Sequence, residues 1–391
     1  MQSEKAITIL ASIMKYFALF LSTLIYLTSY TQNWIDTLDA YARVKYLPAK
    51  RYTWTWQHAA LLNSMIKQYD LGKCDADRVN YLKYVETAMN KTWKRASGKT
   101  PNGVASAMGL AFMYRVTKDE KYKAKAEKVY ADYMKIRRTN NGAVSHLMGF
   151  TELWDDTIFM IGQFLLGMYQ ATGDEKYLDE LMLQIRQHRD KLRTENGLWV
   201  HGWDDDNKQH CMFCSQYNWA DKQTRKSPEA WGRGNGWVVV TLADVVQALP
   251  KENKYHAEVA GYLKEMIAPL PALQDSATGH WYQLPLRKAE EGNYLESSCT
   301  AMFGYGIATA LHTGLVSGKE YKDAVDRAYT GLREYSLVPK GRFLTTANVC
   351  TGTCIGYKQY YFKRAKQQGR TFGIGPFIFF GRKYENTCAK K

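Results

Sequence analysis

Residues 156–192 read DTIFMIGQFLLGMYQATGDEKYLDELMLQIRQHRDKL. An apolar segment from Asp156 to Ala171 is followed by the charged turn Thr172–Tyr177 and an amphipathic segment from Tyr177 to Leu192. Apolar residues at helical spacing on both sides of a turn that contains glycine and acidic residues predict two helices. The two helices form one helical hairpin.

The charged turn that ends in a tyrosine occurs four times along the chain. The copies are Thr117–Tyr122, Thr172–Tyr177, Pro250–Tyr255 and, one residue shorter, Ser317–Tyr321. Their tyrosines are 55, 78 and 66 residues apart, which suits two helices and a variable loop per unit. The segments Trp54–Tyr69 and Asp77–Trp93 predict a further pair of helices, and about six pairs fit the length of the chain.

Strand signals are sparse, because only Gly279–Leu286 and Thr371–Phe380 suggest extended chain. No linker rich in proline or serine divides the sequence, so residues 32–391 are predicted to form a single all-α domain. A closed ring of helix pairs, rather than an open superhelix, would collect the charged turns at one end and the functional loops at the other. The sequence pattern by itself leaves closure undetermined.

The composition indicates a globular protein with an anionic partner. Of 391 residues, 46% are hydrophobic, 14% are aromatic and 23% are charged. The aromatic surplus suits a carbohydrate-binding cleft, although large helical proteins also use aromatic residues as filler. A formal charge of +15 permits nucleic acid, a membrane surface or an acidic polysaccharide. No compact basic run with interleaved aromatic residues is present, so we predict an acidic oligosaccharide substrate and no nucleic acid.

The N-terminal region predicts a signal peptide over residues 1–31. Residues 16–30 are apolar and uncharged, and Ser29 and Thr31 place small residues before a cut at Gln32. This stretch is too short and too rich in Ser and Thr for a membrane span, so we expect a periplasmic or secreted protein without stable membrane insertion. Met14 followed by Lys15 is a more usual start, and an over-called extension over residues 1–13 is the alternative.

The seven cysteines are an odd number, so they cannot all pair within one chain. They are Cys74, Cys211, Cys214, Cys299, Cys350, Cys354 and Cys388. The run from His210 to Cys214, together with Cys350 and Cys354, offers the ligand types of a zinc site. A disulfide in an exported loop or a buried thiol needs fewer coincidences. We therefore predict no metal and no cofactor.

The segment Trp154–Met160 places two adjacent carboxylates beside a tryptophan at the start of an apolar helix. Neighbouring side chains on a helix point about 100° apart, so only one of the two can face a central cleft. Asp156 shares a face with Phe159 and Met160, and apolar surroundings would raise its pKa and let it act as an acid. We predict Asp156 as the catalytic residue. The alternative is that Asp155 or Asp156 only caps the helix.

Two further segments contain candidate binding residues. Residues 231–237 read WGRGNGW, in which glycines let the backbone approach a ligand and Arg233 offers a planar fork for a carboxylate. His201 lies between Trp199 and Trp203 in a segment typical of a loop, where it can bind or polarise a substrate oxygen. The alternatives are a tight turn for the first segment and a structural histidine for the second.

Five segments, in order along the chain, resemble one enzyme family. They are Trp154–Met160, Leu198–Trp203, Trp231–Trp237, Glu296–Phe303 and Gly373–Pro376. They are similar to the unsaturated glucuronyl and galacturonyl hydrolases of glycoside hydrolase families 88 and 105, and most of all to the unsaturated rhamnogalacturonyl hydrolases of family 105. The resemblance implies an (α/α)6 barrel of six helical hairpins. It also implies hydration of the C4=C5 double bond that a polysaccharide lyase leaves on a terminal uronic acid, with release of the adjoining sugar.

The resemblance also implies residue roles. It places Asp156 at the acid/base position, where the carboxyl would protonate C4 and take a proton from the water that adds at C5. The substrate-binding positions that it implies are His146, His201, Trp231, Arg233 and Trp237. The chain departs from the family pattern where Leu147 replaces a common lysine. It departs again in Lys99–Met113, which lacks a second aspartate and offers Asn102.

Two other functions stay open at this point. An endo-acting α-mannanase also uses adjacent aspartates on six hairpins, and would require Asp155 and Asp156 equally. A non-catalytic glycan-binding protein on the same scaffold would explain the missing second aspartate. Arg233 favours an acidic substrate over mannan.

Overall fold

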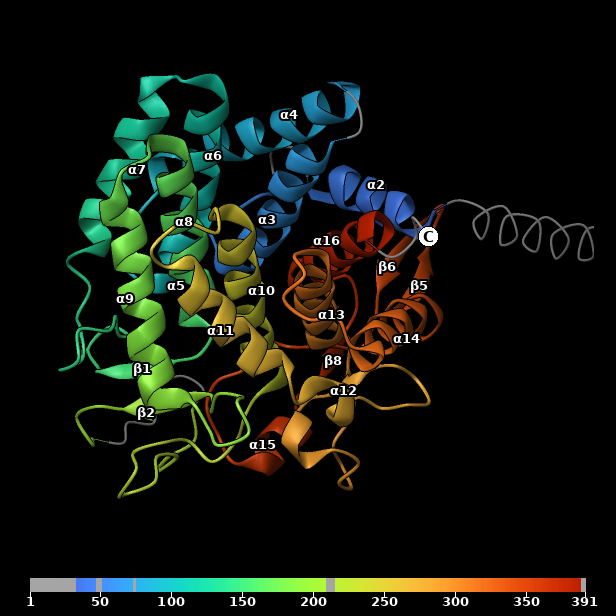
Figure 1. The fold of residues 1–391 in the computed structure, drawn as a ribbon. Helices are drawn as coiled ribbons and strands as arrows, with labels where there is room; N and C mark the ends of the chain where they lie inside the picture. The colour runs from blue at the N-terminus through green and yellow to red at the C-terminus, as the bar shows by residue number, and fades with distance from the viewer. Residues whose placement is uncertain (1–32, 47–50, 73–74, 209–214, 388–391) are drawn as a thin grey trace, which may run out of the picture.

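The computed structural model describes residues 33–46, 51–72, 75–208 and 215–387. Within these residues, an inner ring of helices is surrounded by an outer ring (Figure 1). The inner helices are α3 (Trp56–Leu71), α6 (Met108–Thr117), α8 (Thr157–Thr172), α10 (Gly232–Ala248), α13 (Ser297–His312) and α16 (Thr371–Thr387). The outer helices are α2 (Trp34–Tyr46), α4 (Asp75–Thr92), α7 (Glu120–Tyr133), α9 (Glu175–Leu192), α11 (His256–Ile267) and α14 (Lys319–Tyr335).

The inner ring is closed. Each inner helix packs against the next one along the chain, and α16 packs against α3. Each inner helix also packs against an outer helix, and the outer partner of α16 is α2. The prediction of six helical hairpins in an (α/α)6 barrel is therefore confirmed.

The sequence of each helix matches its place in the two rings. The inner helix α13 is buried along almost its whole length, whereas the outer helix α14 buries residues only on one face. The repeated charged turns begin outer helices, since Asp119 and Asp174 accept hydrogen bonds at 3.1 Å from the backbone N–H groups of Lys121 and Lys176. These two turns therefore cap α7 and α9, whereas the copies before α11 and α14 make no side-chain cap hydrogen bond.

The two ends of the barrel differ. Short connections lead from α6 to α7 and from α8 to α9 at one end, whereas the connections into the inner helices are long and gather β1, β2, α12 and α15 at the other end (Figure 1). The long connections contain the short helices α5 (Pro101–Val104), α12 (Leu270–Leu273) and α15 (Lys358–Phe362). They also contain four antiparallel strand pairs, which are β1 (Glu152–Trp154) with β2 (Gly202–Asp204), β3 (Trp281–Tyr282) with β4 (Leu295–Glu296), β5 (Leu337–Lys340) with β6 (Phe343–Thr346), and β7 (Val349–Cys350) with β8 (Lys366–Gln367).

One of the two predicted extended segments is wrong. Gly279–Leu286 contains β3, but Thr371–Phe380 is the first part of the helix α16. The glycines of this segment serve helix packing instead, because a Cβ at Gly375 would lie 2.4 Å from the carbonyl oxygen of Ala60 on α3. An inner helix that is buried on all sides has no amphipathic period. Without this period, the sequence of the segment gave no helix signal, and extended chain was predicted instead.

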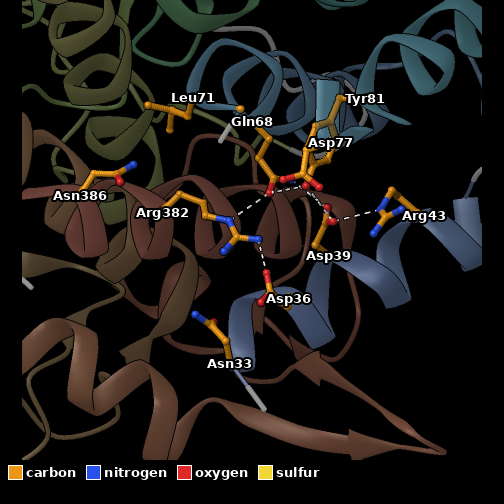
Figure 2. A pocket seen from close by; sticks show the side chains of 11 residues that line it. Asn33, Asp36, Asp39, Arg43, Gln68, Leu71, Asp77, Tyr81, Arg382 and Asn386 are labelled. Carbon is orange, nitrogen blue, oxygen red and sulfur yellow. Dashed lines mark hydrogen bonds and ion pairs between the residues drawn. The ribbon is translucent and has the colours of Figure 1, made fainter. Parts of the chain in front are cut away.

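A polar cluster joins α2 and α16, the first and last helices of the described residues, around a cavity of about 400 Å³ (Figure 2). Asp39, which is 1% exposed, accepts hydrogen bonds from Arg43 Nε at 2.9 Å, Gln68 Nε2 at 2.8 Å and the Tyr81 hydroxyl at 3.1 Å. Arg382 on α16 donates to Gln68 Oε1 at 3.2 Å and also pairs with Asp36 on α2. The cluster, which we call the seam, links α2, α3, α4 and α16 where the chain closes its ring.

Several sequence predictions fall outside the described residues, namely the signal peptide over residues 1–31 and the run from His210 to Cys214. Of the two other cysteines in the zinc alternative, Cys350 is a buried free thiol and Cys354 is disulfide-bonded. The disulfide removes Cys354 as a thiolate ligand. In the part of the chain that the structure describes, no helix has both the length and the apolar character that crossing a bilayer requires.

Candidate active site

The carboxylate pair lies in the turn between β1 and α8, at the end of the barrel with the long connections. Strand β1 pairs with β2 so that Trp154 lies opposite Gly202. This register brings His201 beside the pair, and Asp155 N donates to the carbonyl oxygen of His201 at 3.0 Å. Asp156 occupies the cap position of α8, but its side chain makes no cap hydrogen bond. The helix-cap alternative therefore does not explain this residue.

The glycine-rich run WGRGNGW begins α10 and packs directly against the carboxylate pair. A Cβ at Gly234 would lie 2.2 Å from Asp155 Oδ2, so only glycine fits beside this carboxyl group. Asn235 holds the next loop in place, because its side chain accepts from Trp199 N and donates to Trp199 O, both at 2.8 Å. The glycines thus make room for neighbouring parts of the chain, where the sequence suggested room for a ligand.

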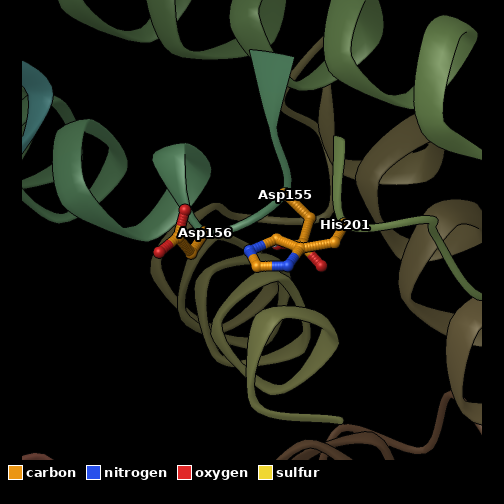
Figure 3. A group of neighbouring side chains, drawn as sticks. All are labelled: Asp155, Asp156 and His201. Carbon is orange, nitrogen blue, oxygen red and sulfur yellow. The ribbon is translucent and has the colours of Figure 1, made fainter. Parts of the chain in front are cut away.

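Asp155, Asp156 and His201 form a compact polar group (Figure 3). One ligand-type atom from each lies within 4.8 Å of the others. Both carboxylate oxygens of Asp155, Oδ1 of Asp156 and Nε2 of His201 are buried and have no hydrogen-bond partner within the described residues. Three atoms no more than 4.8 Å apart share a central point no more than about 2.8 Å from each, which is within hydrogen-bond distance. Unpartnered buried polar atoms indicate a place for a water or a ligand oxygen.

Burial controls the charge state of the site. It raises the pKa of Asp155 well above its usual range, and the charge of Asp156 raises it further. Burial also raises the pKa of Asp156 to about 7, against the opposing effect of the Arg233 charge. Burial lowers the pKa of His201 well below its usual value, with help from His146 and Arg233, and lowers the pKa of His146 to about 3. The elevated pKa expected for Asp156 is confirmed, and both imidazoles are neutral near pH 7.

His146 lies beside Asp156. Its ring stacks on Trp154, with centroids 4.4 Å apart and planes 3° apart. Its Nδ1 is 2.8 Å from Thr157 Oγ1 and 3.6 Å from Asp156 Oδ1. Its Nε2 is 3.4 Å from Asn102 Nδ2 at the start of α5. The predicted residue His146 is thus at the site, and Asn102 lies in the site as well.

Arg233 is at the site but differs from its expected geometry. The guanidinium is 0% exposed and lies over the rings of Trp231 and Phe372, at 4.7 and 4.9 Å from their centroids. Its Nη1 donates to the carbonyl oxygen of Cys350 at 2.5 Å and its Nη2 to that of Thr351 at 2.7 Å, while Nε has no partner in the described chain. The two fork nitrogens therefore bind the main chain, where the sequence suggested a substrate carboxylate.

The two tryptophans of the run have different places. Trp231 contacts the site, because its ring lies 4.6 Å from the ring of His201. Trp237 is 0% exposed and packs at 4.2 Å on Phe159 in the main hydrophobic core. Trp231 is the N-cap residue of α10 and has an extended backbone, whereas Trp237 lies within the helix. Burial does not separate Trp237 from Arg233 and His201, which are also 0% exposed, so its role in substrate binding stays a prediction.

Sequence reasoning missed Tyr361 on α15. Its hydroxyl is 2.8 Å from His201 Nδ1, although the two residues are 160 positions apart. Nothing in the sequence around Tyr361 indicates this contact, because it depends on how the long connection before α16 folds over the site.

The group of Asp155, Asp156 and His201 also has the ligand types of a metal site. Metal binding requires ionised carboxylates, whereas both carboxyl groups here have raised pKa values. The charge of Arg233 acts on the same place and disfavours a cation. These surroundings suit a neutral oxygen better than a metal ion, and the absence of a metal stays a prediction.

Comparison with known proteins gives the family. The sequence matches glycosyl hydrolase family 88 over residues 26–388. The chain belongs to this family. Among curated relatives of this family 88 protein, the unsaturated rhamnogalacturonyl hydrolase YesR of Bacillus subtilis is 26% identical over 343 residues, which cover 83% of this chain and 88% of the relative. An unsaturated 3S-rhamnoglycuronyl hydrolase of Formosa agariphila is 26% identical over 188 residues, which cover 46% of each protein.

Solved structures agree with the fold. A family 105 glycoside hydrolase of C. acetobutylicum superposes with a TM-score of 0.78 at 22% identity, covering 91% of this chain and all of that chain. A possible family 105 member from Klebsiella pneumoniae superposes with a TM-score of 0.71 at 25% identity, covering 85% and 82%. The family 88 assignment confirms that the chain is a glycoside hydrolase, and it speaks against the α-mannanase alternative.

Proposed function

We propose that this family 88 protein hydrates the C4=C5 double bond of a terminal unsaturated uronic acid and releases the adjoining sugar. The proposal depends mainly on Asp156, a buried carboxyl whose pKa is raised to about 7 and whose Oδ1, like the Asp155 oxygens and His201 Nε2, has no hydrogen-bond partner in the described residues. The protonated carboxyl can donate to carbon, and the position shared with Asp155 and His201 can hold the attacking water.

The atoms of the proposed reaction balance with one water consumed. Asp156 transfers its proton to C4, and the positive charge that develops at C5 is shared with the ring oxygen. Water adds to C5 and returns a proton to the Asp156 carboxylate, which restores the acid. The resulting hemiketal opens to a ketone at C5 and leaves the former ring oxygen as a hydroxyl group on C1. This C1 hemiacetal then becomes an aldehyde, and the neighbouring sugar leaves as an alcohol whose oxygen takes the proton of the C1 hydroxyl. A pair of carboxylates at a fixed glycosidase separation is not needed.

The substrate class follows from charge and from the relatives. The formal charge of +15 favours acidic oligosaccharides. The names of the relatives refer to unsaturated rhamnogalacturonyl and 3S-rhamnoglycuronyl substrates. We therefore propose lyase products of rhamnogalacturonan or a related acidic glycan as substrates. We also propose export of the protein, on the basis of the apolar segment at residues 16–30.

The test follows the ultraviolet absorbance of the conjugated double bond in unsaturated galacturonyl and glucuronyl disaccharides. The wild type should remove the absorbance and Asp156→Asn should not. Asp190→Asn, at a position with a 64% exposed side chain on α9, serves as the control and should behave as wild type. Full activity of Asp156→Asn, or no turnover of any unsaturated disaccharide by the wild type, would contradict the proposal.

The family 88 assignment also speaks against the remaining alternative, a non-catalytic glycan-binding protein. Asn102 stands in the region where the family commonly has a second aspartate, and it contacts His146.

A further inference from the structure

The Tyr361 hydroxyl contacts one of the site's two histidines and nothing else that the proposed reaction uses. Its oxygen lies 2.8 Å from His201 Nδ1 and accepts a hydrogen bond from Gly356 N at 3.3 Å. The side chain is 0% exposed. A hydroxyl has one proton to donate, and His201 Nδ1 is the acceptor that the described residues place beside it.

These contacts decide which nitrogen of His201 carries the proton. The ring is neutral, so one nitrogen is a donor and the other an acceptor. With the proton on Nδ1, His201 and Gly356 would both donate to the Tyr361 oxygen, and the buried phenol proton would have no acceptor in the described part of the chain. With the proton on Nε2, Gly356 donates to Tyr361, Tyr361 donates to Nδ1, and every proton on this side of the ring has a partner.

We infer that Tyr361 is a positioning residue that fixes His201 as the Nε2–H tautomer, so that the site offers an N–H donor to the oxygen held beside Asp155 and Asp156. His201 Nε2 is 3.9 Å from Asp155 Oδ1, too far for a direct hydrogen bond and suitable for one oxygen between them. Its catalytic consequence depends on the proposed function.

The orientation of the donor matters for the proposed chemistry. A water that accepts a hydrogen bond from His201 Nε2–H can still donate both of its own protons. One of them can then point at Asp156, which takes a proton from this water in the second half of the reaction. With the other tautomer, Nε2 would be an acceptor and would compete with Asp156 for the same proton.

The test compares Tyr361→Phe with Tyr360→Phe. Both hydroxyls accept a hydrogen bond from a loop N–H group, that of Gly356 for Tyr361 and that of Cys354 at 3.0 Å for Tyr360. Only Tyr361 also contacts His201. We expect Tyr361→Phe to lower kcat on unsaturated disaccharides on the order of 10- to 100-fold with little change in KM, the usual effect of losing a partner that orients a histidine. Tyr360→Phe should keep kcat close to wild type.

Nitrogen NMR of histidine-labelled protein provides a readout independent of activity. The chain has 8 histidines, and His201→Gln assigns the His201 signals by their disappearance. The wild type should show a protonated Nε2 and a bare Nδ1, and Tyr361→Phe should show a mixture of tautomers. A wild-type His201 protonated at Nδ1 would overturn the inference, even if Tyr361→Phe does not fold. Equal kcat losses in the two Phe variants would also overturn it. If no uronide is turned over but the tautomer still depends on Tyr361, the proposed function fails and the inference stands.

Discussion

Replacing Asp156 with asparagine should abolish turnover and at the same time stabilise the fold at neutral pH. The ordinary pKa of an aspartate is 3.8, and burial in the site raises that of Asp156 to about 7. At pH 7 this carboxyl holds its proton about half of the time, roughly three orders of magnitude more often than an exposed aspartate. The same shift corresponds to about 4 kcal/mol of destabilisation of the ionised, folded form.

The sign of the stability effect follows from proton linkage. The folded state holds the proton of Asp156 up to about pH 7, whereas the unfolded state releases it near pH 3.8. Stability contributed by the bound proton is therefore lost progressively from about pH 4 to pH 7. Asparagine cannot ionise, so the stability advantage of Asp156→Asn should be small below pH 4, grow up to about pH 7 and stay constant above it.

Urea unfolding at several pH values measures this advantage, and the decay of double-bond absorbance measures activity. For the wild type, kcat/KM should fall about tenfold between pH 6 and pH 8, because the reaction starts from the protonated carboxyl. Asp190→Asn, on the exposed face of α9, should change neither measurement. A stability difference for Asp156→Asn that is the same at pH 4 and pH 7 would refute the reasoning, since the burial effect would then be absent.

Three further changes test other parts of the structure. Gly234→Ala should inactivate the enzyme, because its Cβ would lie 2.2 Å from a carboxylate oxygen of the site, while Gly261→Ala, with no heavy atom within 4 Å, should keep activity. Asn102→Asp should move the basic limb of kcat/KM upward by about one pH unit, because a negative charge beside His146 raises nearby carboxyl pKa values; an unchanged profile would count against this contact. Asp39→Ala should lower the free energy of unfolding by about 3 kcal/mol in urea, because three donors of the seam lose their acceptor; a loss near zero would show that water replaces it.

The helical scaffold was predictable from the sequence because each helix depends on a local pattern of residues. An apolar segment, a charged turn and an amphipathic segment each reflect the environment of one helix, so residues 156–192 predict a hairpin without knowledge of the rest. The raised pKa of Asp156 was predictable in direction for the same reason, since its apolar neighbours are adjacent in sequence. The helix α16 was the exception, because burial on every side removes the amphipathic signal.

The details of the site depended on distant parts of the chain. Arg233 has the fork of a carboxylate ligand, but main-chain carbonyls more than 100 residues later occupy both fork nitrogens. Tyr361 reaches His201 across 160 residues through a connection without regular pattern. Trp237 looked equivalent to Trp231 in the motif, yet Trp231 precedes α10 in extended backbone, whereas Trp237 lies within the helix and packs in the main core. The residue types indicated the correct region of the chain, but the contacts that each side chain makes depended on the tertiary structure.

The two adjacent carboxyls are chemically different because their electrostatic surroundings differ. Burial raises both pKa values, but only Asp156 has the opposing charge of Arg233 among its influences, whereas Asp155 has the charge of Asp156 added to burial. A helix N-terminus favours a carboxylate by about 0.3–2 kcal/mol, less than the shift of about 4 kcal/mol at Asp156, so burial prevails over the start of α8. Burial and the charge of Asp156 thus both favour the protonated form of Asp155, while Asp156 can lose its proton and regain it near pH 7. An acid that must donate to carbon and then recover a proton from water needs this intermediate pKa, and the charge of Arg233 supports it by opposing the effect of burial.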